Sequence, residues 1–521
     1  MDPKDATPPD APVDEAPRPE KRPSPRAVPD AAAPTSAQKR AASPTKSPAA
    51  KRTPAAKRSP AAKRSATGAA PATAAPARGR TRPKDHVHDV VVVGGGPSGS
   101  SCAYWLADAG WDVAVVEKKQ FPREKTCGDG LTPRAVRQLA DMGLEEALAG
   151  SHRFTGLRSC GWGLVLEMPW PAHPVFPPYG CTITRHDLDA LVAERAAKAG
   201  AVVHQHTEAL EPLLADASGS AGTPRVAPPG ASLPECGGVV VRDVGTGVTR
   251  EVRGRYVVVA DGSNSRIGRA LGTTRQRGYP LGMALRGYYR SPRHDDPYIE
   301  SHLDIRDAAG DVVPGYGWIF PLGDGRVNVG VGLLSTDERW KGVNTSRLME
   351  AFVAGAPASW ELSEETSCGP PTGGKLPMSF GVVPHTGPNV LVIGDASGAI
   401  NPFNGEGIAY GYETGRLAAA SLSEALAGDG SAGVGRYEER LEAGYRDYYR
   451  VGRAFVRLIS NPAAMHWCVS VGMRSEAFMS QLMRIMANLM RPGTPGAAEL
   501  GYDALVRIAE LVPEQVAALL A

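Results

Sequence analysis

The stretch HDVVVVGGGPSGSSCAYWLADAGWDVAVVE, residues 88–117, decides the fold. Its four consecutive valines predict a buried strand, which is followed by a glycine-rich turn, a helix and a second strand. The glycines have the spacing G-x-G-x-x-G and are Gly94, Gly96 and Gly99. Glu117 follows at the end of the second strand. This order of elements is typical of a dinucleotide-binding βαβ unit.

Each part of the turn has a role toward a bound pyrophosphate. Gly94 permits the tight turn, Gly96 lets the backbone approach the phosphates, and Gly99 lets the helix pack closely on the strand. The helix that begins at Pro97 and Ser98 directs free N–H groups at the negative charge. The acid at the end of the second strand is expected to bind a ribose hydroxyl. The motif predicts dinucleotide binding without distinguishing FAD from NAD.

A second motif favours FAD. Residues 389–419, NVLVIGDASGAINPFNGEGIAYGYETGRLAA, predict a strand, a loop that contains Asp395, and a helix that starts near Gly407 and Ile408. Asp395 is suited to accept hydrogen bonds from a ribityl chain. The positive end of the helix favours the negative charge that develops on the flavin pyrimidine upon reduction. A nicotinamide enzyme has no use for this element, so we expect FAD as the cofactor.

The first 85 residues have a different composition from the rest of the chain. They contain 18 Lys and Arg against 8 Asp and Glu, a net charge of +10, whereas the whole chain carries +3, which leaves the remainder near −7. Residues 47–64 repeat the hexad SPAAKR, TPAAKR, SPAAKR. Such a segment predicts a disordered basic tail. It is either a solubilising tail or one that is loosely attracted to anionic lipid or nucleic acid, and nothing in it predicts a specific nucleic-acid partner.

The cysteines and the hydropathy of the chain indicate in which cellular compartment the protein is expected. The seven cysteines are odd in number and never have the C-x-x-C spacing of a zinc or redox site, so we expect no metal and a reduced cytoplasmic environment. No apolar run reaches about 18 residues, and no signal peptide is apparent. Any membrane contact is therefore expected to be peripheral.

These patterns predict an α/β fold with a Rossmann-type FAD-binding domain, a β-rich substrate domain like that of flavin hydroxylases, and a C-terminal helical region. Residues 214–236, rich in Gly and Pro, predict an inserted surface loop. The expected division is 1–85 disordered tail, 86–270 FAD-binding domain (first part), 271–384 β-rich substrate domain, 385–427 FAD-binding domain (second part) and 428–521 helical region.

A methionine stripe marks the helical region. It consists of Met479, Met483, Met486 and Met490, spaced for one face of a helix. Such a stripe favours core packing, and a lipid-facing or quinone-facing surface is the alternative.

Three further segments resemble the geranylgeranyl reductase family, flavoenzymes that saturate carbon–carbon double bonds in isoprenoid chains. They are FPREKTCGDGLTPRAV (121–136), PGYGWIFPLGDGRVNVGVG (314–332) and NPFNGEGIAYGYETG (401–415). The match is closest to the actinobacterial branch, in which the implied activity is reduction of one isoprene unit of the menaquinone tail. With VVVADGSNSRIGRAL before them, the motifs are also similar to the wider flavin monooxygenase and reductase superfamily over residues 86–425.

The resemblance implies roles for further residues. The turn that lies against the flavin in the family corresponds to Cys127, Gly128, Asp129 and Gly130. The isoprenoid pocket would be lined by Tyr316 and Trp318. The family arginine that reaches the cofactor corresponds to Arg185, and a backbone group at Ala209 would meet the adenine. The chain departs from the family pattern at Gly95 and Ser98, where alanine is common, and in the basic tail.

The implied reaction leaves several points open. An isolated trisubstituted alkene has no carbonyl to stabilise a carbanion, so a proton and a hydride must both be delivered. Asp129, Cys127, Tyr316 and water are candidate proton donors. The expected substrate is a lipophilic isoprenoid or quinone at the inner face of the cell membrane. Because no second strand–glycine turn–helix unit is found for a nicotinamide nucleotide, the electron donor is either NAD(P)H or a small redox protein.

Two other functions compete with this interpretation. One is an FAD-dependent aromatic hydroxylase or halogenase of the same superfamily, and the absence of a Trp-x-Trp-x-Ile segment argues against a halogenase. The other is a nucleic-acid or membrane scaffold built around the tail, which contains no aromatic residues for stacking on bases.

Overall fold

The computed structural model describes residues 86–214, 232–336, 338–491, 493 and 495–511. All of them belong to one compact unit, residues 72–521. The predicted disordered tail, 1–85, lies outside the described residues. So does most of the predicted loop 214–236, namely residues 215–231.

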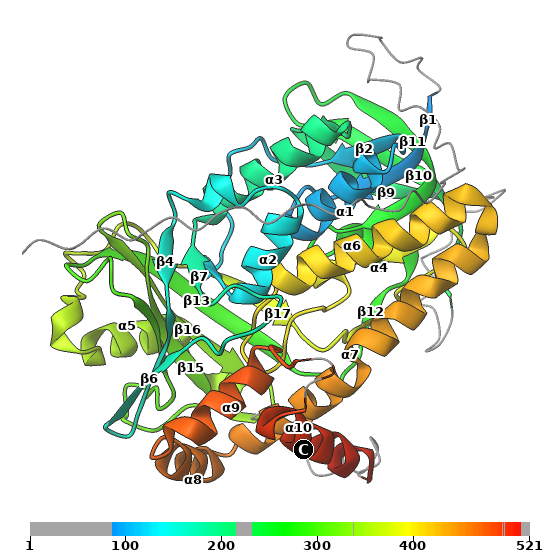
Figure 1. Cartoon of the computed structure of the whole chain (residues 1–521). Helices are drawn as coiled ribbons and strands as arrows, with labels where there is room; N and C mark the ends of the chain where they lie inside the picture. The colour runs from blue at the N-terminus through cyan, green and yellow to red at the C-terminus, as the bar shows by residue number, and fades with distance from the viewer. Residues whose placement is uncertain (1–85, 215–231, 337, 492, 494, 512–521) are drawn as a thin grey trace, which may run out of the picture. The chain divides into compact units, whose positions relative to one another are not determined.

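The first sheet is the Rossmann-type sheet that the opening motif predicts (Figure 1). Its strand order is β8-β2-β1-β11-β10-β9, and β19 also pairs with β11. The strands are β1 (Val87–Val93), β2 (Val113–Val116), β8 (Val202–His204), β9 (Thr207–Leu214), β10 (Cys236–Asp243), β11 (Thr249–Val259) and β19 (Val390–Val392).

The registers align the carboxyl ends of the parallel strands. Val93 at the end of β1 pairs with Val116 of β2 and with Val259 of β11, and Val259 pairs with Val392 of β19. The two glycine-rich motifs therefore start from the same edge of the sheet. In open α/β sheets this edge is where ligands bind.

Helices cover one face of this sheet. Packed on it are α1 (Pro97–Asp108), α3 (Arg185–Ala199) and α6 (Ile408–Glu424). The predicted helix from residue 185 ends as expected, because Gly200 adopts φ 122° directly after it. Valines of the central strands are buried on both faces, as is typical of a parallel sheet. The opposite face is closed by β9, β10 and α4 (Arg266–Leu271).

The second sheet has the order β17-β13-β16-β15-β14-β5-β6. Two of its strands, β5 and β6, come from within 86–270, which the sequence assigned wholly to the FAD-binding domain. The sequence interpretation did not identify these two strands or their place in the other sheet. The strands are β5 (Gly156–Gly161), β6 (Leu164–Pro169), β13 (Leu281–Arg290), β14 (Tyr298–His302), β15 (Gly315–Pro321), β16 (Arg326–Leu334) and β17 (Thr372–Pro377).

Smaller elements connect the two sheets. A three-stranded sheet has the order β3-β7-β4, and β12 pairs with β18. The helix α5 packs on the second sheet. The elements are β3 (Gly130–Leu131), α2 (Pro133–Asp141), β4 (His152–Phe154), β7 (Gly180–Thr182), β12 (Thr274–Arg275), α5 (Thr345–Gly355) and β18 (Val382–Val383).

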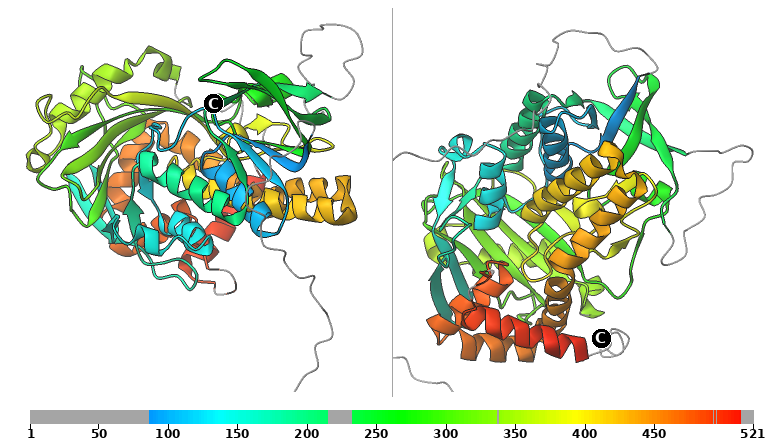
Figure 2. Two further views of the ribbon diagram at one scale, coloured as in Figure 1. Left: turned by 90° about the horizontal axis from the view of Figure 1, so that it is seen from above. Right: turned by 45° about the vertical axis from the view of Figure 1, so that its right-hand side comes forward.

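The C-terminal part of the chain is helical, as predicted. The long helix α7 (Ser431–Ile459) runs back along α6 and leads to α8 (Pro462–Gly472), α9 (Glu476–Met486) and α10 (Ala497–Leu511). Figures 1 and 2 show α8, α9 and α10 gathered next to the second sheet, where α9 contacts β6.

The methionine stripe is part of the core. Met479 and Met483 are buried, and Met486 and Met490 pack against the main core. The stripe is not one helical face, because α9 ends at Met486.

Candidate active site

The glycine loop after β1 lies against the segment that follows β11. Gly94 has φ 104°, and a Cβ there would come within 2.4 Å of the Ala260 carbonyl oxygen. A Cβ on Gly99 would lie 1.9 Å from the Gly94 carbonyl oxygen. Both positions therefore require glycine, which is the reason for the predicted spacing.

The second motif meets the first at Ser98. A Cβ on Gly394 would lie 2.4 Å from the Ser98 hydroxyl, and one on Gly415 would lie 2.5 Å from the Ser98 carbonyl oxygen. The Ser101 hydroxyl donates to the Tyr412 carbonyl at 3.0 Å. Motifs that lie about 300 residues apart in the chain thus form one site, in which α1 and α6 pack closely.

Asp395 lies beside the start of α6. A Cβ on Gly407, the residue before Ile408, would come within 3.1 Å of its Oδ1, so a side chain there would crowd the carboxylate. Burial raises the pKa of Asp395 above its ordinary value. A buried carboxylate of this kind is suited to accept hydrogen bonds from ligand hydroxyls.

Glu117 is held by the backbone and by an arginine that the sequence did not single out. Its carboxylate accepts from the N–H groups of Gly95 and Lys119, each at 2.9 Å. Arg123 lies 3.5 Å from it and forms an ion pair with Asp189 at 2.9 Å. Arg123 was missed because it stands in a loop without regular spacing.

Asp129 holds the Cys127–Gly130 turn in place. It is fully buried at φ 62°, a left-handed conformation that is costly for a residue other than glycine. One carboxylate oxygen accepts from the backbone N–H of Arg185 at 3.1 Å. The other accepts from the Tyr288 hydroxyl at 2.6 Å and the Asn328 amide at 2.8 Å. Both carboxylate oxygens are thus engaged in holding the turn, and burial raises the pKa of the Asp129 carboxyl above its ordinary value.

The aromatic segment of β15 packs against this turn. A Cβ on Gly128 would meet the Phe320 ring at 3.2 Å. Trp318 is buried, and its indole N–H donates to Asn328 at 3.0 Å. The ring of Tyr316 is 5.9 Å from that of Trp318 and remains partly accessible. Tyr316 and Phe320 therefore offer the accessible aromatic surface, and Trp318 supports them from the core.

Arg185 and Ala209 lie at the same edge of the first sheet. The Arg185 guanidinium is buried and binds Asp189 through two hydrogen bonds, at 2.6 and 2.7 Å. Ala209 lies on β9, whose first residue, Thr207, donates its N–H to the Glu117 carbonyl at 2.9 Å. The structure thus places Ala209 near the acid that is expected to bind the ribose.

Glu406 is a site residue that the sequence interpretation missed. Its Oε1 accepts from the Thr132 hydroxyl at 2.5 Å, and its Oε2 is buried without a partner among the described residues. Burial raises its pKa to about 7. The Tyr316 hydroxyl donates at 2.7 Å to the carbonyl of Asn404, two residues before. An acid in a polar Gly/Asn loop resembles an ordinary exposed residue, so only the tertiary structure reveals its burial.

The edge fits an FAD molecule in three respects. Neither α1 nor α6 has a side-chain cap, so the first N–H groups of both helices stay available for anionic groups. A Cβ on Gly96 would meet only the Arg123 guanidinium, at 3.9 Å, which leaves space above the loop. The buried Oδ1 of Asp261 has no partner within the described part of the chain. The fold and this site define an FAD-dependent oxidoreductase.

Comparisons with known proteins agree with that class. Residues 87–284 match the family model of an FAD binding domain. A menaquinone reductase of Mycolicibacterium smegmatis is 40% identical over 406 residues, which cover 77% of this chain and 92% of the relative. A digeranylgeranylglycerophospholipid reductase of Methanopyrus kandleri is 30% identical and covers 71% and 90%. The chain therefore belongs to the geranylgeranyl reductase family of FAD-dependent oxidoreductases.

Solved structures share the fold. A geranylgeranyl bacteriochlorophyll reductase-like protein of Thermoplasma acidophilum superposes with a TM-score of 0.60 at 23% identity, covering 81% of this chain and 98% of that one. A flavin-dependent brominase reaches 0.63 at 19% identity, covering 82% and 100%. The predicted fold class, the cofactor and the family are thus confirmed.

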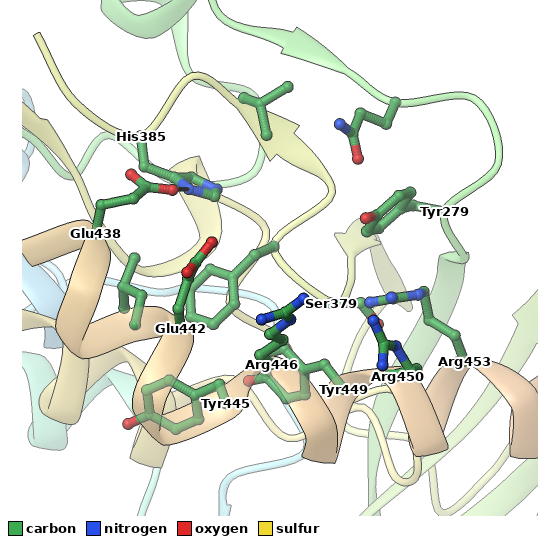
Figure 3. A pocket seen from close by; sticks show the side chains of 14 residues that line it. Tyr279, Ser379, His385, Glu438, Glu442, Tyr445, Arg446, Tyr449, Arg450 and Arg453 are labelled. Atoms are coloured by element: carbon green, nitrogen blue, oxygen red, sulfur yellow. Dashed lines mark hydrogen bonds and ion pairs between the residues drawn. The ribbon is translucent and has the colours of Figure 1, made fainter. Parts of the chain in front are cut away.

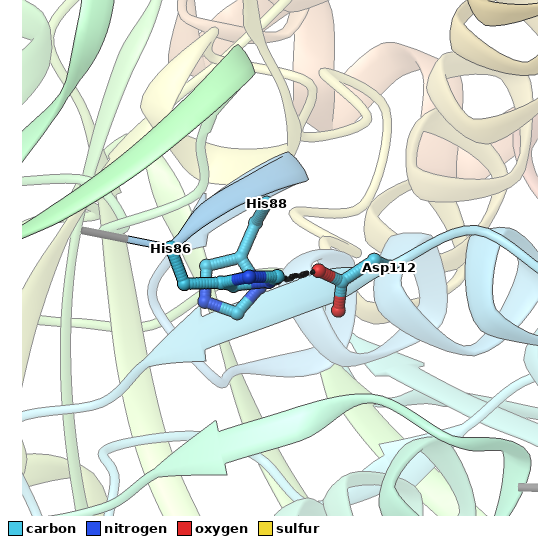
Figure 4. Close-up of side chains that lie close together, drawn as sticks. All are labelled: His86, His88 and Asp112. Atoms are coloured by element: carbon cyan, nitrogen blue, oxygen red, sulfur yellow. Dashed lines mark hydrogen bonds and ion pairs between the residues drawn. The ribbon is translucent and has the colours of Figure 1, made fainter. Parts of the chain in front are cut away.

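Two other clusters of polar side chains lie away from this edge. His86 and His88 both contact the Asp112 Oδ2, at 2.6 and 3.1 Å, at the start of β1 and opposite the glycine loop (Figure 4). On β14, Glu300 binds His302 at 3.0 Å and the Trp360 indole at 2.9 Å. Hydrogen bonds account for the proximity of the side chains in both groups.

Proposed function

We propose that this protein reduces one carbon–carbon double bond in the isoprenoid tail of a menaquinone, saturating one isoprene unit. The observation that carries the proposal is the partly accessible aromatic surface of Phe320, which lies on the Cys127–Gly130 turn, and of Tyr316, whose hydroxyl reaches the loop before α6. An apolar chain bound against these rings would lie beside the expected flavin position. The name of the 40% identical relative, menaquinone reductase, supports the choice of substrate.

The chain's own residues would bind and orient the alkene. Bound FAD, once reduced, supplies the hydride. Protonation of a trisubstituted alkene leaves cationic character on the tertiary carbon, and aromatic faces stabilise such charge. Tyr316 is suited to this task, because its hydroxyl is fixed on the Asn404 carbonyl and its ring orientation is thereby restricted.

We assign the proton to Oε2 of Glu406. A general acid works best when its pKa lies near the working pH, and the pKa of Glu406 is about 7. In the chain, Glu406 stands between Asn404, whose carbonyl binds the Tyr316 hydroxyl, and the start of α6, and its carboxylate contacts the Thr132 hydroxyl. Asp129 is engaged at both oxygens, and burial raises the pKa of the Cys127 thiol, which makes it a weaker acid.

Mass spectrometry of cellular quinones tests the substrate assignment. Cells with the gene are expected to contain menaquinone two hydrogens heavier in the tail than cells without it. A plasmid that encodes the protein should restore the shift, and one that encodes Asp395→Ala should not. An unchanged quinone spectrum, or a product with an added oxygen, would exclude the proposal.

We also propose that the protein reaches its substrate by peripheral contact with the inner face of the cell membrane. Among the described residues, no helix is long and apolar enough to cross a membrane. Large apolar side chains on α8 and α9 are nevertheless exposed, including Trp467 at 67% and Phe478 at 56%. Such residues favour contact with the membrane interface.

A further inference from the structure

A groove runs between α7 and two loops, residues 276–279 and 379–385. One cavity in it has a volume of about 280 Å³. A second, of about 350 Å³, shares Gln276, Val383, His385 and Glu438 with the first, so the two are continuous. Ligand pockets span roughly 300 to 1,000 Å³, and the combined groove therefore suits an elongated small molecule.

One end of the groove is cationic. In Figure 3, the guanidinium groups of Arg446, Arg450 and Arg453 gather near Tyr279 and Ser379. Arg453 stacks on the Tyr279 ring at 4.7 Å. Within the described part of the chain, Arg450 has no carboxylate partner, although it is only half-exposed. A half-buried guanidinium without a counter-ion favours an anionic ligand.

Ser379 adds a hydroxyl to this end. It is only 2% exposed, and its Oγ has no hydrogen-bond partner among the described residues. Its backbone is rigid, because the N–H groups of Ser379 and Phe380 donate to the carbonyls of Ile400 and Gly398, at 3.0 and 2.7 Å. Both residues adopt a positive φ. An unsatisfied buried hydroxyl in a strained turn is typical of a ligand-binding position.

The other end of the groove offers hydrogen-bond acceptors. The ring nitrogen Nδ1 of His385 lies 2.9 Å from the Glu438 carboxylate, whereas Nε2 is buried and has no partner in the part of the chain that the structure describes. When Nδ1 donates to Glu438, Nε2 is an acceptor. The side-chain oxygen of Gln276 is likewise buried, with no partner from the described residues. Together with the exposed carboxylate of Glu442, this end suits hydroxyl and amino groups.

We propose that the groove binds a nucleotide, with phosphate at the Arg446–Arg450–Arg453 end and the sugar or base at the His385 end. A nucleotide combines the two chemistries that the ends require. The loop 379–383 is bonded to residues 397–400, which follow Asp395 directly, so the groove lies behind the expected flavin site. If the proposed reductase function holds, a reduced nicotinamide nucleotide is the class of ligand that also supplies its electrons.

Calorimetric titration of the FAD-loaded, full-length protein with NADP⁺ tests the site. Arg450→Ala and Ser379→Ala are expected to weaken binding, the arginine change by about 10-fold or more because it removes charge-assisted hydrogen bonds. Glu442→Gln keeps an acceptor oxygen at the exposed edge of the sugar or base end and should leave binding unchanged. Arg347→Ala, an exposed arginine on α5, is the matched control and should leave the dissociation constant unchanged. The flavin absorbance spectrum of each variant checks that it is folded.

Two further binding experiments distinguish a nucleotide phosphate from a lipid headgroup as the ligand. Inorganic pyrophosphate is expected to compete with NADP⁺ at the site. Lack of NADP⁺ binding by the wild-type protein, or equal binding by Arg450→Ala, would overturn the proposal. So would a result in which Arg450→Ala weakens only the binding to phosphatidylglycerol vesicles, since the site would then recognise a lipid headgroup. The titration contains no quinone, so it succeeds or fails independently of the quinone mass measurement.

Discussion

Three carboxyl groups near the proposed flavin position differ in what surrounds them. Asp129 accepts hydrogen bonds at both oxygens and supports a turn, and Asp395 is half-buried beside Gly407. Glu406 keeps one buried oxygen that has no partner among the described residues. We therefore assign the same chemical group to three roles, to position the turn, to bind the cofactor and to hold a proton, according to its hydrogen bonds and burial.

The role of Glu406 predicts a pH profile. Its Oε2 carries the proton below pH 7 and loses it as the pH rises through the pKa of about 7, so turnover should fall above that pH. Glu406→Gln is expected to lower kcat by about 100-fold or more and to abolish this dependence. Steady-state kinetics over pH 5.5–9 measures both effects.

Two comparisons distinguish proton donation from a structural role. FAD affinity and the flavin absorbance spectrum should be the same in Glu406→Gln as in the wild type. Glu439→Gln, an exposed glutamate on α7, should keep the wild-type profile. If the turnover of Glu406→Gln still fell above about pH 7 as in the wild type, Glu406 would be excluded as the proton donor.

Asp395 predicts a change in cofactor affinity. Removing a carboxylate that accepts hydrogen bonds from the cofactor should weaken FAD binding by about 10-fold or more. Asp395→Ala is therefore expected to purify with much less flavin than the wild type, and Asp395→Asn, which keeps one acceptor oxygen, with an intermediate amount. Flavin absorbance per protein chain is the measurement. A full complement of FAD in Asp395→Ala would contradict the assignment.

At the scale of elements, the crossing of α1 and α6 creates the site. The helices approach so closely at Gly415 and Ser98 that no side chain fits between them. This brings the unsatisfied N–H groups at the start of α1 and of α6 to the same edge of the sheet. The same edge of the sheet therefore offers N–H groups to both the expected pyrophosphate and the expected flavin ring.

The helices α8 and α9 predict reversible membrane binding. Trp467→Ser combined with Phe478→Ser removes two exposed apolar side chains, each of which contributes about 1.5–3 kcal/mol when fully buried. The double variant should therefore bind phospholipid vesicles at least about 10-fold more weakly in co-sedimentation. Val248→Ser, an exposed valine in the turn between β10 and β11, is the control and should bind normally. Normal binding by the double variant would refute this membrane face.

At the scale of the whole molecule, charge is divided unevenly along the chain. The first 85 residues carry +10 and the remainder about −7. A basic segment is attracted to anionic lipid surfaces, and salt screens this attraction. The rest of the chain contains every residue that we assign to FAD, to the alkene and to the proposed nucleotide.

Deletion of residues 1–85 should therefore separate two properties. The shortened protein is expected to retain its FAD content and its kcat toward a detergent-solubilised quinone. Its binding to anionic vesicles should become weaker and less dependent on salt than that of the full chain. Loss of turnover in detergent after the deletion would show that the tail takes part in catalysis.

The sequence by itself determined the cofactor, the fold class and the family. Gly94, Gly99 and Asp395 stand in local motifs, and local backbone geometry is encoded by residues that are close in the chain. The aromatic segment that begins at Tyr316 was recognisable for the same reason. These features can be recognised without knowing which segments far apart in the chain contact one another.

Only the tertiary structure decided which side chains are buried and what they contact. It moved β5 and β6 into the second sheet, made Asp129 a support of its turn and buried the Oε2 atom of Glu406. It also aligned Arg450 with Ser379 in one groove. Burial and hydrogen-bond partners depend on segments that lie far apart in sequence, and these contacts set the pKa and the role of each polar group.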